Sequence, residues 1–161
     1  MDIIKITQAN DALAQMVALF RVELRSYKGV TSKPNIESGR EEMEEYLSAG
    51  FPVFAAVMDG EYAGYVVCRV DSEVVWVESI FVKEEYRRHG VATALHSKAE
   101  EIAASYGEDT VYNYVHPNNH RMIAFLRKRG YTVLNLIEIR KPYQGEQPTQ
   151  TITVGEHAFD Y

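Results

Sequence analysis

Apolar residues recur every three or four positions in four stretches of the chain, and this spacing is typical of amphipathic helices. Asp11 stands where the first stretch begins and is predicted to cap it. Ser38 is followed by Glu41 in the spacing of a capping box, which predicts the start of the second helix. The predicted helices cover residues 11–27, 39–48, 90–106 and 118–129.

Strands are predicted where short runs are rich in Val, Ile and aromatic residues, or where apolar and polar residues alternate. The pair Asp59-Gly60 separates two such runs and indicates a hairpin turn. The predicted strands cover residues 3–6, 51–58, 61–70, 73–82, 110–116, 131–141 and 150–161. The element order is then β-α-α-β-β-β-α-β-α-β-β, which predicts one α/β domain over residues 1–161, with a mixed sheet flanked by helices.

Composition and charge narrow the class of protein. The chain has 161 residues, of which 46% are hydrophobic and 25% charged, as in soluble globular domains. Its 17 Lys and Arg against 23 Asp and Glu argue against nucleic-acid binding, because phosphate backbones need clustered cations. The single Cys68 cannot form an internal disulfide, and no apolar run approaches the ~18 residues of a membrane span. We therefore expect a cytoplasmic protein that binds neither nucleic acid nor membrane, without a leader segment.

The stretch EEYRRHGVAT, residues 84–93, joins a predicted strand to a helix that begins without Ser, Thr, Asp or Asn. A helix start leaves about four backbone N–H groups unpaired, and these groups together with the helix dipole attract anions. Gly90 removes a Cβ where a ligand would approach the backbone, and Arg87 and Arg88 add positive charge. The stretch predicts a site for a phosphate or pyrophosphate, and a solvated basic turn is the alternative.

Two motifs resemble the GCN5-related N-acetyltransferase (GNAT) family. SIFVKEEYRRHGVATAL is similar to that family's acetyl-CoA motif, and NNHRMIAFLRKRGY is similar to the second motif that follows it. The two motifs lie in residues 78–106 and 110–131, and VESIFV with FLRKRG is most similar to the polyamine-type members. The resemblance implies a GNAT-like fold and direct transfer of an acetyl group from acetyl-CoA to a primary amine of a small molecule.

The resemblance also assigns residues to the cofactor. The backbone of Ile80 to Val82 is expected to pair with pantetheine like an added strand, and the Ile80 N–H is expected to face the thioester carbonyl. Asn119 matches an asparagine that contacts the pantetheine arm, and the loop and helix start are expected to hold the pyrophosphate. The expected cofactor-binding residues are Ile80, Phe81, Val82, Arg87, Arg88, His89, Gly90, Val91, Ala92, Thr93 and Asn119.

Glu78 is the predicted catalytic side chain, together with the backbone of Ile80. An ammonium is not a nucleophile, so the acceptor amine has to lose a proton, and a carboxylate at the acceptor cleft can take it. Glu78 lies on the same predicted strand as the pantetheine edge. The alternative is that Glu78 lies on a solvent-facing side of the strand or pairs with a nearby Arg.

Leu126 departs from the family pattern, because the family commonly has a tyrosine there that protonates the leaving thiolate. Either the thiolate leaves without an acid, or another phenol supplies the proton, or the domain only binds or senses acyl-CoA. The candidate phenols are Tyr112, Tyr114 and Tyr143.

The remaining candidates concern metals, thiols and assembly. His116 and His120 have no Cys or carboxylate partners at ligand spacing, so no metal site is predicted. Cys68 on a strand is typical of a buried small apolar residue.

The last predicted strand, residues 150–161, has to pair with another strand, because an open apolar edge invites aggregation. It can pair beside 131–141 in the same chain or across a homodimer, and we expect the homodimer.

Overall fold

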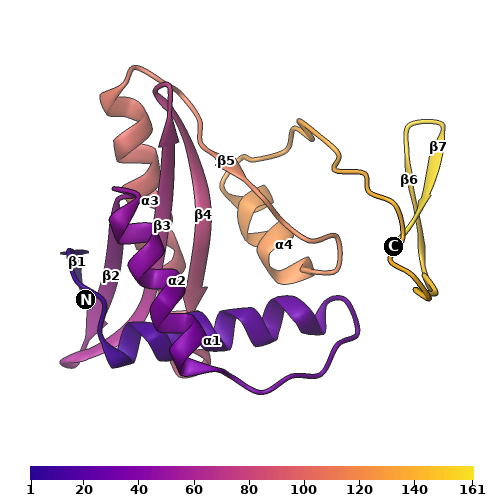
Figure 1. The fold of residues 1–161 in the computed structure, drawn as a ribbon. Coiled ribbons are helices and arrows are strands. Elements are labelled where there is room, and N and C mark those ends of the chain that lie inside the picture. Colours follow the sequence, from indigo (N-terminus) through magenta and orange to yellow (C-terminus); the bar gives the residue numbers. More distant parts are fainter. The chain divides into compact units, whose positions relative to one another are not determined.

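A computed structural model describes all 161 residues of the chain. The order of helices and strands is β-α-α-β-β-β-α-β-α-β-β, with one additional short 3-10 helix, η1 (Glu84–Tyr86) (Figure 1). It agrees with the prediction up to the fourth helix, whereas the last two strands are not the predicted segments 131–141 and 150–161. The chain forms two compact units, Met1–Phe125 and Leu126–Tyr161, which are described in turn. That both units belong to a single functional domain stays a prediction.

A five-stranded sheet forms the centre of the first unit, in the order β1-β2-β3-β4-β5. The first four strands are antiparallel to their neighbours, and β5 is parallel to β4, so the sheet is mixed as predicted. The strands are β1 (Asp2–Ile6), β2 (Val53–Met58), β3 (Glu61–Asp71), β4 (Val74–Val82) and β5 (Tyr112–Asn113).

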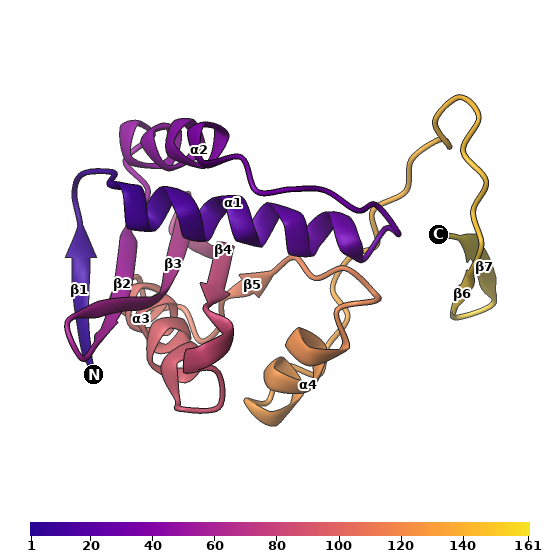
Figure 2. The same cartoon turned by 90° about the horizontal axis from the view of Figure 1, so that it is seen from below.

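Helices cover both faces of this sheet. Figure 2 shows α1 (Asp11–Ser26) and α2 (Ile36–Ser48) on one face and α3 (Val91–Ser105) on the other. The core on the α1 face joins apolar side chains of both helices to Tyr65 and Phe81 of the sheet. A fourth helix, α4 (His120–Lys128), begins in the first unit. No helix is long and apolar enough to cross a lipid bilayer.

Two predicted helix caps are wrong, although both helices exist. Asn10 caps α1, since its side chain accepts a hydrogen bond from the Leu13 N–H at 3.0 Å. Asn35 caps α2 in the same way, and its side chain accepts from the Ser38 N–H at 3.1 Å. A capping residue has extended backbone and precedes the first turn. Asp11 and Ser38 lie within the first turns, so they cannot serve as these caps.

The predicted turn at Asp59-Gly60 is confirmed. Both residues have positive φ angles, 53° and 82°, as the tight hairpin turn between β2 and β3 requires. The predicted strand over 110–116 is shorter than expected, because only Tyr112–Asn113 pair with β4.

The second unit differs most from the prediction. Residues 131–141 form no strand, and their apolar side chains are exposed, with Val133 at 88%. The tail is not a single strand over 150–161 but a hairpin of β6 (Thr151–Val154) and β7 (His157–Asp160). The tail therefore finds its hydrogen-bonding partner within itself, and the predicted pairing beside 131–141 is wrong.

Candidate functional site

One edge of β4 is open over most of its length. The ladder with β5 contains only Trp76 and Val77 on the β4 side, whereas β3 pairs with β4 up to Val82. Beyond Val77, β4 has no neighbouring strand on the side away from β3. Such an edge can hold an extended ligand through main-chain hydrogen bonds. The predicted pantetheine-binding backbone, Ile80–Val82, lies in this open part.

The helix that follows begins without a side-chain cap, as predicted. Gly90 is the residue before α3, has a φ of 80°, and makes no capping hydrogen bond through a side chain. Nothing lies within 4 Å of a Cβ built on Gly90, so glycine serves the left-handed backbone here and leaves open space in front of the helix. Arg88 also has a positive φ, 69°, which is strained for an arginine. Strain of this kind gathers at functional loops.

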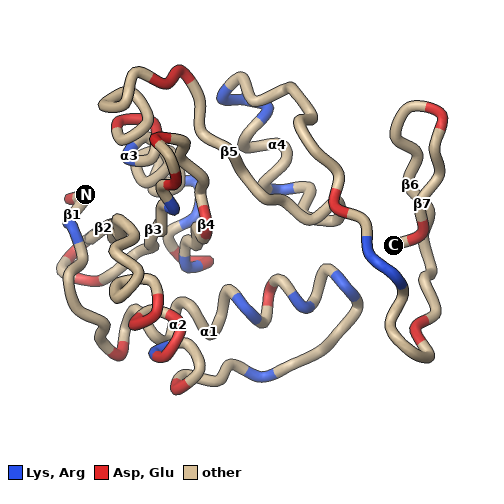
Figure 3. Tube along the Cα trace, turned by 45° about the horizontal axis from the view of Figure 1, so that its top comes forward, with Lys and Arg blue, Asp and Glu red and all other residues tan.

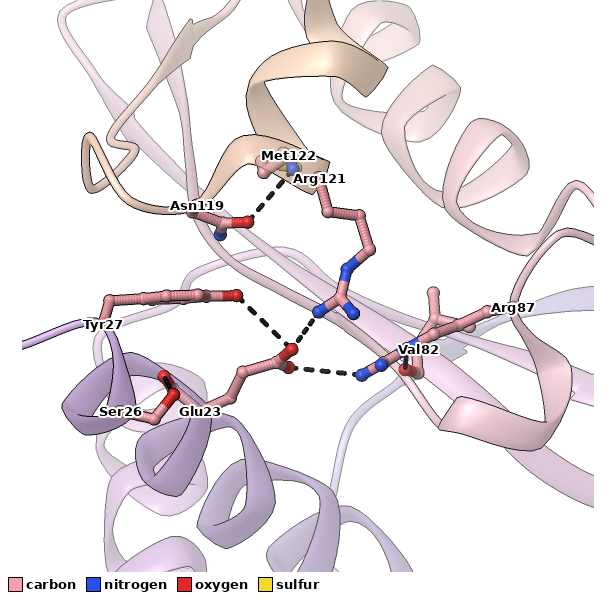
Figure 4. A network of polar contacts seen from close by, with 8 residues as sticks. All are labelled: Glu23, Ser26, Tyr27, Val82, Arg87, Asn119, Arg121 and Met122. Atoms are coloured by element: carbon pink, nitrogen blue, oxygen red, sulfur yellow. Dashed lines mark hydrogen bonds and ion pairs between the residues drawn. The ribbon is translucent and has the colours of Figure 1, made fainter. Parts of the chain in front are cut away.

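Arg87 is fixed by the protein. Its Nε donates to the Val82 carbonyl at 3.0 Å, and its Nη2 lies 3.2 Å from the Glu23 carboxylate (Figure 4). Glu23 also pairs with Arg121 near the start of α4 and accepts a hydrogen bond from the Tyr27 hydroxyl at 3.4 Å. Burial, and then the Glu23 charge, raise the pKa of Tyr27. The network joins α1, the loop after β4 and α4, and the sequence did not indicate Glu23 or Arg121.

Asn119 has a local structural role. Its Oδ1 accepts a hydrogen bond from the Met122 N–H at 3.0 Å at the start of α4 (Figure 4). This contact caps the helix and holds the side chain in place. Its predicted contact with pantetheine stays a prediction.

Glu78 lies at an irregularity in the sheet. Val67 is opposite Ser79 and Cys68 is opposite Val77, so Glu78 is the extra residue of a β-bulge. The Glu78 carboxylate lies 3.1 Å from Arg69 Nε, and both side chains are about one-third exposed, at 31% and 29%. Pairing with an arginine, which the sequence left as an alternative, is thus present. A catalytic role for Glu78 stays a prediction.

Aromatic residues lie beside the arginine of this ion pair. The Arg69 guanidinium lies over the Trp76 ring at 4.3 Å and donates to the Tyr114 hydroxyl at 3.3 Å. Trp76 packs against Tyr112, with ring centroids 5.6 Å apart. We call these five residues, Arg69, Trp76, Glu78, Tyr112 and Tyr114, the Glu78 cluster. Two of the three candidate phenols therefore lie in the same cluster as the candidate base, a proximity that the sequence could not establish.

The third candidate phenol and Leu126 belong to the second unit. Tyr143 is exposed and lies against Arg140, whose guanidinium is 4.4 Å from its ring. Leu126 is buried, with 7% of its surface exposed.

A separate polar cluster links the two helices on the α1 face. Glu42 accepts hydrogen bonds from Arg21 at 2.6 and 2.5 Å and from the Tyr46 hydroxyl at 2.6 Å. Burial, followed by the hydrogen bond to Glu42, raises the pKa of Tyr46 well above its usual range. Figure 3 shows further acidic residues along α2, where Glu37, Glu41, Glu44 and Glu45 are exposed.

Cys68 is buried, and His116 packs against an aromatic ring. Cys68 is buried in β3, as predicted, and burial raises the pKa of its thiol to about 12, which leaves it protonated at neutral pH. His116 stacks on Tyr27 with ring centroids 6.0 Å apart. No three His, Cys, Asp or Glu side chains are grouped so that they could hold a metal ion.

Comparison with known proteins identifies the family. Residues 16–131 match the model of the Acetyltransferase (GNAT) family. The chain belongs to the GNAT family. The N-alpha-acetyltransferase of Saccharolobus solfataricus is 28% identical over 111 residues, which are 61% of this chain and 65% of that protein. The N-alpha-acetyltransferase of Sulfurisphaera tokodaii is 29% identical over 114 residues, 60% and 64% of the two chains. The matched part thus spans slightly less than two thirds of these relatives.

Solved structures share the fold. The aminoglycoside antibiotic 6'-N-acetyltransferase AAC(6')-IG from Acinetobacter haemolyticus aligns with a TM-score of 0.63 and 21% identity over 89% of this chain and 99% of its own. The aminoglycoside N-acetyltransferase AAC(6')-Iy in complex with CoA aligns with a TM-score of 0.64 and 23% identity, over 87% and 93%. The predicted GNAT fold is therefore confirmed. The nearness to polyamine-type members stays a prediction.

Proposed function

We propose that this chain is an acetyl-CoA-dependent N-acetyltransferase that transfers an acetyl group directly to a primary amine of a small molecule. One arrangement carries the proposal: the open edge of β4 runs from the carboxylate at its bulge toward an uncapped helix start. The open edge can form main-chain hydrogen bonds with an extended pantetheine arm, and the helix start can bind the anionic pyrophosphate. The carboxylate can bind the acceptor amine. The names of the relatives, N-alpha-acetyltransferases and aminoglycoside acetyltransferases, support an amine acceptor.

Acetyl-CoA is the co-substrate that these residues fit. The pyrophosphate is assigned to the loop and the first turn of α3, where the open space before Gly90 and the absence of a side-chain cap favour an anion. Pantetheine is assigned to the β4 backbone from Ile80 to Val82 and to Asn119. The Val82 carbonyl already accepts from Arg87, so pantetheine either shares that oxygen or displaces the arginine.

The proposed chemistry uses few groups. The acceptor nitrogen attacks the thioester carbonyl carbon, a C–N bond forms, and the C–S bond breaks as the thiolate leaves. Glu78 takes the proton that the ammonium loses before the attack, and the nitrogen releases a second proton to solvent as the C–N bond forms. The Ile80 N–H donates to the carbonyl oxygen while negative charge develops there. Leu126 has no proton to give, so the thiolate leaves as an anion and takes its proton from solvent.

Thiol release tests the proposal directly. The protein with acetyl-CoA and a panel of amino acids, peptides, polyamines and aminoglycosides should release free thiol that depends on the amine. The buried Leu126 favours a second candidate, a domain that binds or senses acyl-CoA without catalysis. That candidate predicts stabilisation by acetyl-CoA against heat and no thiol release with any amine.

We also propose that the chain forms a homodimer through its C-terminal region. Exposed apolar side chains in the predicted strand 131–141 support an interface there, because a second chain could cover them. Leu136→Asp and Ile137→Asp together should then convert a dimer to a monomer, measured as mass in solution. A wild-type protein that is monomeric at micromolar concentration contradicts the homodimer.

A further inference from the structure

The Glu78 cluster holds one positive and one negative charge side by side. The Arg69 guanidinium and the Glu78 carboxylate are 3.1 Å apart and partly exposed, so an amine that reaches Glu78 also meets Arg69. We propose that Arg69 determines acceptor specificity by binding a carboxylate that the acceptor carries close to its amine. This inference rests on the proposed acetyl transfer at Glu78.

Arg69 is held more firmly than a simple counter-ion requires. Its guanidinium stacks over Trp76, donates through Nε to Glu78 and donates through Nη2 to Tyr114. Arg69 lies opposite Trp76 in the β3–β4 register, so the stacked pair shares one face of the sheet. An arginine whose plane is fixed in this way loses little freedom on binding a ligand.

Donors remain on the fixed guanidinium. An arginine has five N–H donors, and the contacts to Glu78 and Tyr114 use two of them. Since 29% of the side chain is exposed, a ligand can reach the others. A planar guanidinium matches a carboxylate with two parallel hydrogen bonds, which a lysine cannot provide.

The balance of charge selects the kind of acceptor. The ion pair is neutral overall, so it complements an acceptor that is itself dipolar, with the ammonium at Glu78 and the carboxylate at Arg69. A polycationic amine would place a second positive charge near Arg69 and be disfavoured. The acidic residues of α2 do not reverse this preference, because Glu42 is engaged by Arg21 and Tyr46, and the others are exposed to solvent.

Matched acceptors test the inference. One pair is an α-amino acid and its amide, which differ by the carboxylate, and the other is a peptide beginning with Asp and the same peptide beginning with Asn. We expect a kcat/KM roughly 10- to 100-fold higher for the carboxylate-bearing member of at least one pair, the range for a hydrogen bond between charged groups. The first pair detects free amino acids and the second detects acidic peptide ends.

Variants then test whether Arg69 causes the preference for the carboxylate-bearing acceptor. Arg69→Gln should remove it and leave the KM for acetyl-CoA unchanged, whereas Arg69→Lys should retain only part of it. Glu78→Gln should slow both members of a pair, because it removes the base that both of them need. Arg25→Gln, an exposed position on α1, is the matched loss of charge and should leave the preference intact.

The results of these experiments distinguish failure of the Arg69 role from failure of acetyl transfer itself. Equal use of both members of each pair, a polycationic amine as the best acceptor, or a preference that survives Arg69→Gln overturns the role of Arg69 while acetyl transfer stands. No thiol release with any amine overturns acetyl transfer, and the inference falls with it. If Arg69→Gln does not fold, the wild-type comparison of matched acceptors and the Arg69→Lys variant still decide.

Discussion

Two segments of the chain carry a similar strand pattern and adopt different structures. Residues 74–82 form β4, with Val75, Val77, Ser79 and Phe81 buried in alternation. Residues 131–141 are equally rich in Val, Leu and Ile, yet form no strand and expose these side chains. Both segments have a high strand propensity, so propensity alone does not decide whether a segment forms a strand.

The two segments differ in whether a neighbouring strand is available to pair with them. β4 pairs with β3 along nearly its whole length, and this pairing holds it extended even where its other edge is open. Residues 131–141 have no strand on either side. An open edge that is supported on its other side can serve as a binding surface, because its backbone is already fixed before a ligand arrives. We therefore propose that the functional site lies on β4 and not on 131–141.

The largest expected effect concerns the loop at the end of β4. Gly90→Val should weaken CoA binding roughly 100-fold or more, since valine is strained at a φ of 80° and its side chain enters the space assigned to the pyrophosphate. At 100 times Kd, CoA should stabilise the wild type by about 2.7 kcal/mol, and the same CoA concentration should stabilise the variant by about 0.4 kcal/mol or less. Thermal unfolding with and without CoA measures it.

Gly107→Val is the matched control for that variant. Gly107 follows α3 with a φ of 82° and open space around its Cβ position, so the backbone strain is the same while the predicted site is distant in sequence. CoA should still stabilise this control. Equal loss of stabilisation in both variants would show that strain, and not the site, is responsible.

The next effect concerns catalysis at the bulge. Glu78→Gln should lower turnover about 100-fold near neutral pH, the usual scale for loss of a general base, while CoA affinity hardly changes. Steady-state rates and a CoA titration check both parts. Unchanged turnover would leave Glu78 with only its structural pairing to Arg69.

A smaller effect is expected when a valine is replaced by alanine in each of the two segments. Val75→Ala removes a fully buried side chain from β4 and should cost roughly 2 kcal/mol of unfolding free energy. Val133→Ala, at an exposed position in 131–141, should change it by less than about 0.5 kcal/mol. Denaturant unfolding of both variants gives the values. A cost at Val133 as large as that at Val75 would mean that 131–141 is packed in solution.

Local pattern predicted much of the first unit. The helical spacing, the Asp59-Gly60 turn and the uncapped start at Gly90 depend on neighbouring residues, and all of them are present. The caps were misplaced because Asn10 and Asn35 stand within a few residues of equally suitable Asp and Ser side chains.

The rest of the site depends on topology. Arg69 meets Glu78 only because β3 and β4 pair and place Arg69 opposite Trp76, two residues from Glu78 on β4, and no local sequence pattern specifies that register. Glu23 and Arg121 are 98 positions apart and meet through the placement of α1 and α4. Whether 131–141 becomes a strand depends likewise on a partner outside the segment, and its own residues do not specify one.

Hydrogen exchange of backbone amides with and without CoA tests the central claim most directly, since it reads β4 and 131–141 in one experiment. CoA should slow exchange at residues 80–82 and 90–93, where the open edge and the helix start are assigned to it. Exchange at residues 133–139 should not change. Slowed exchange that is confined to 133–139, or no change at 80–82 and 90–93 at saturating CoA, would contradict the assignment of the site to β4.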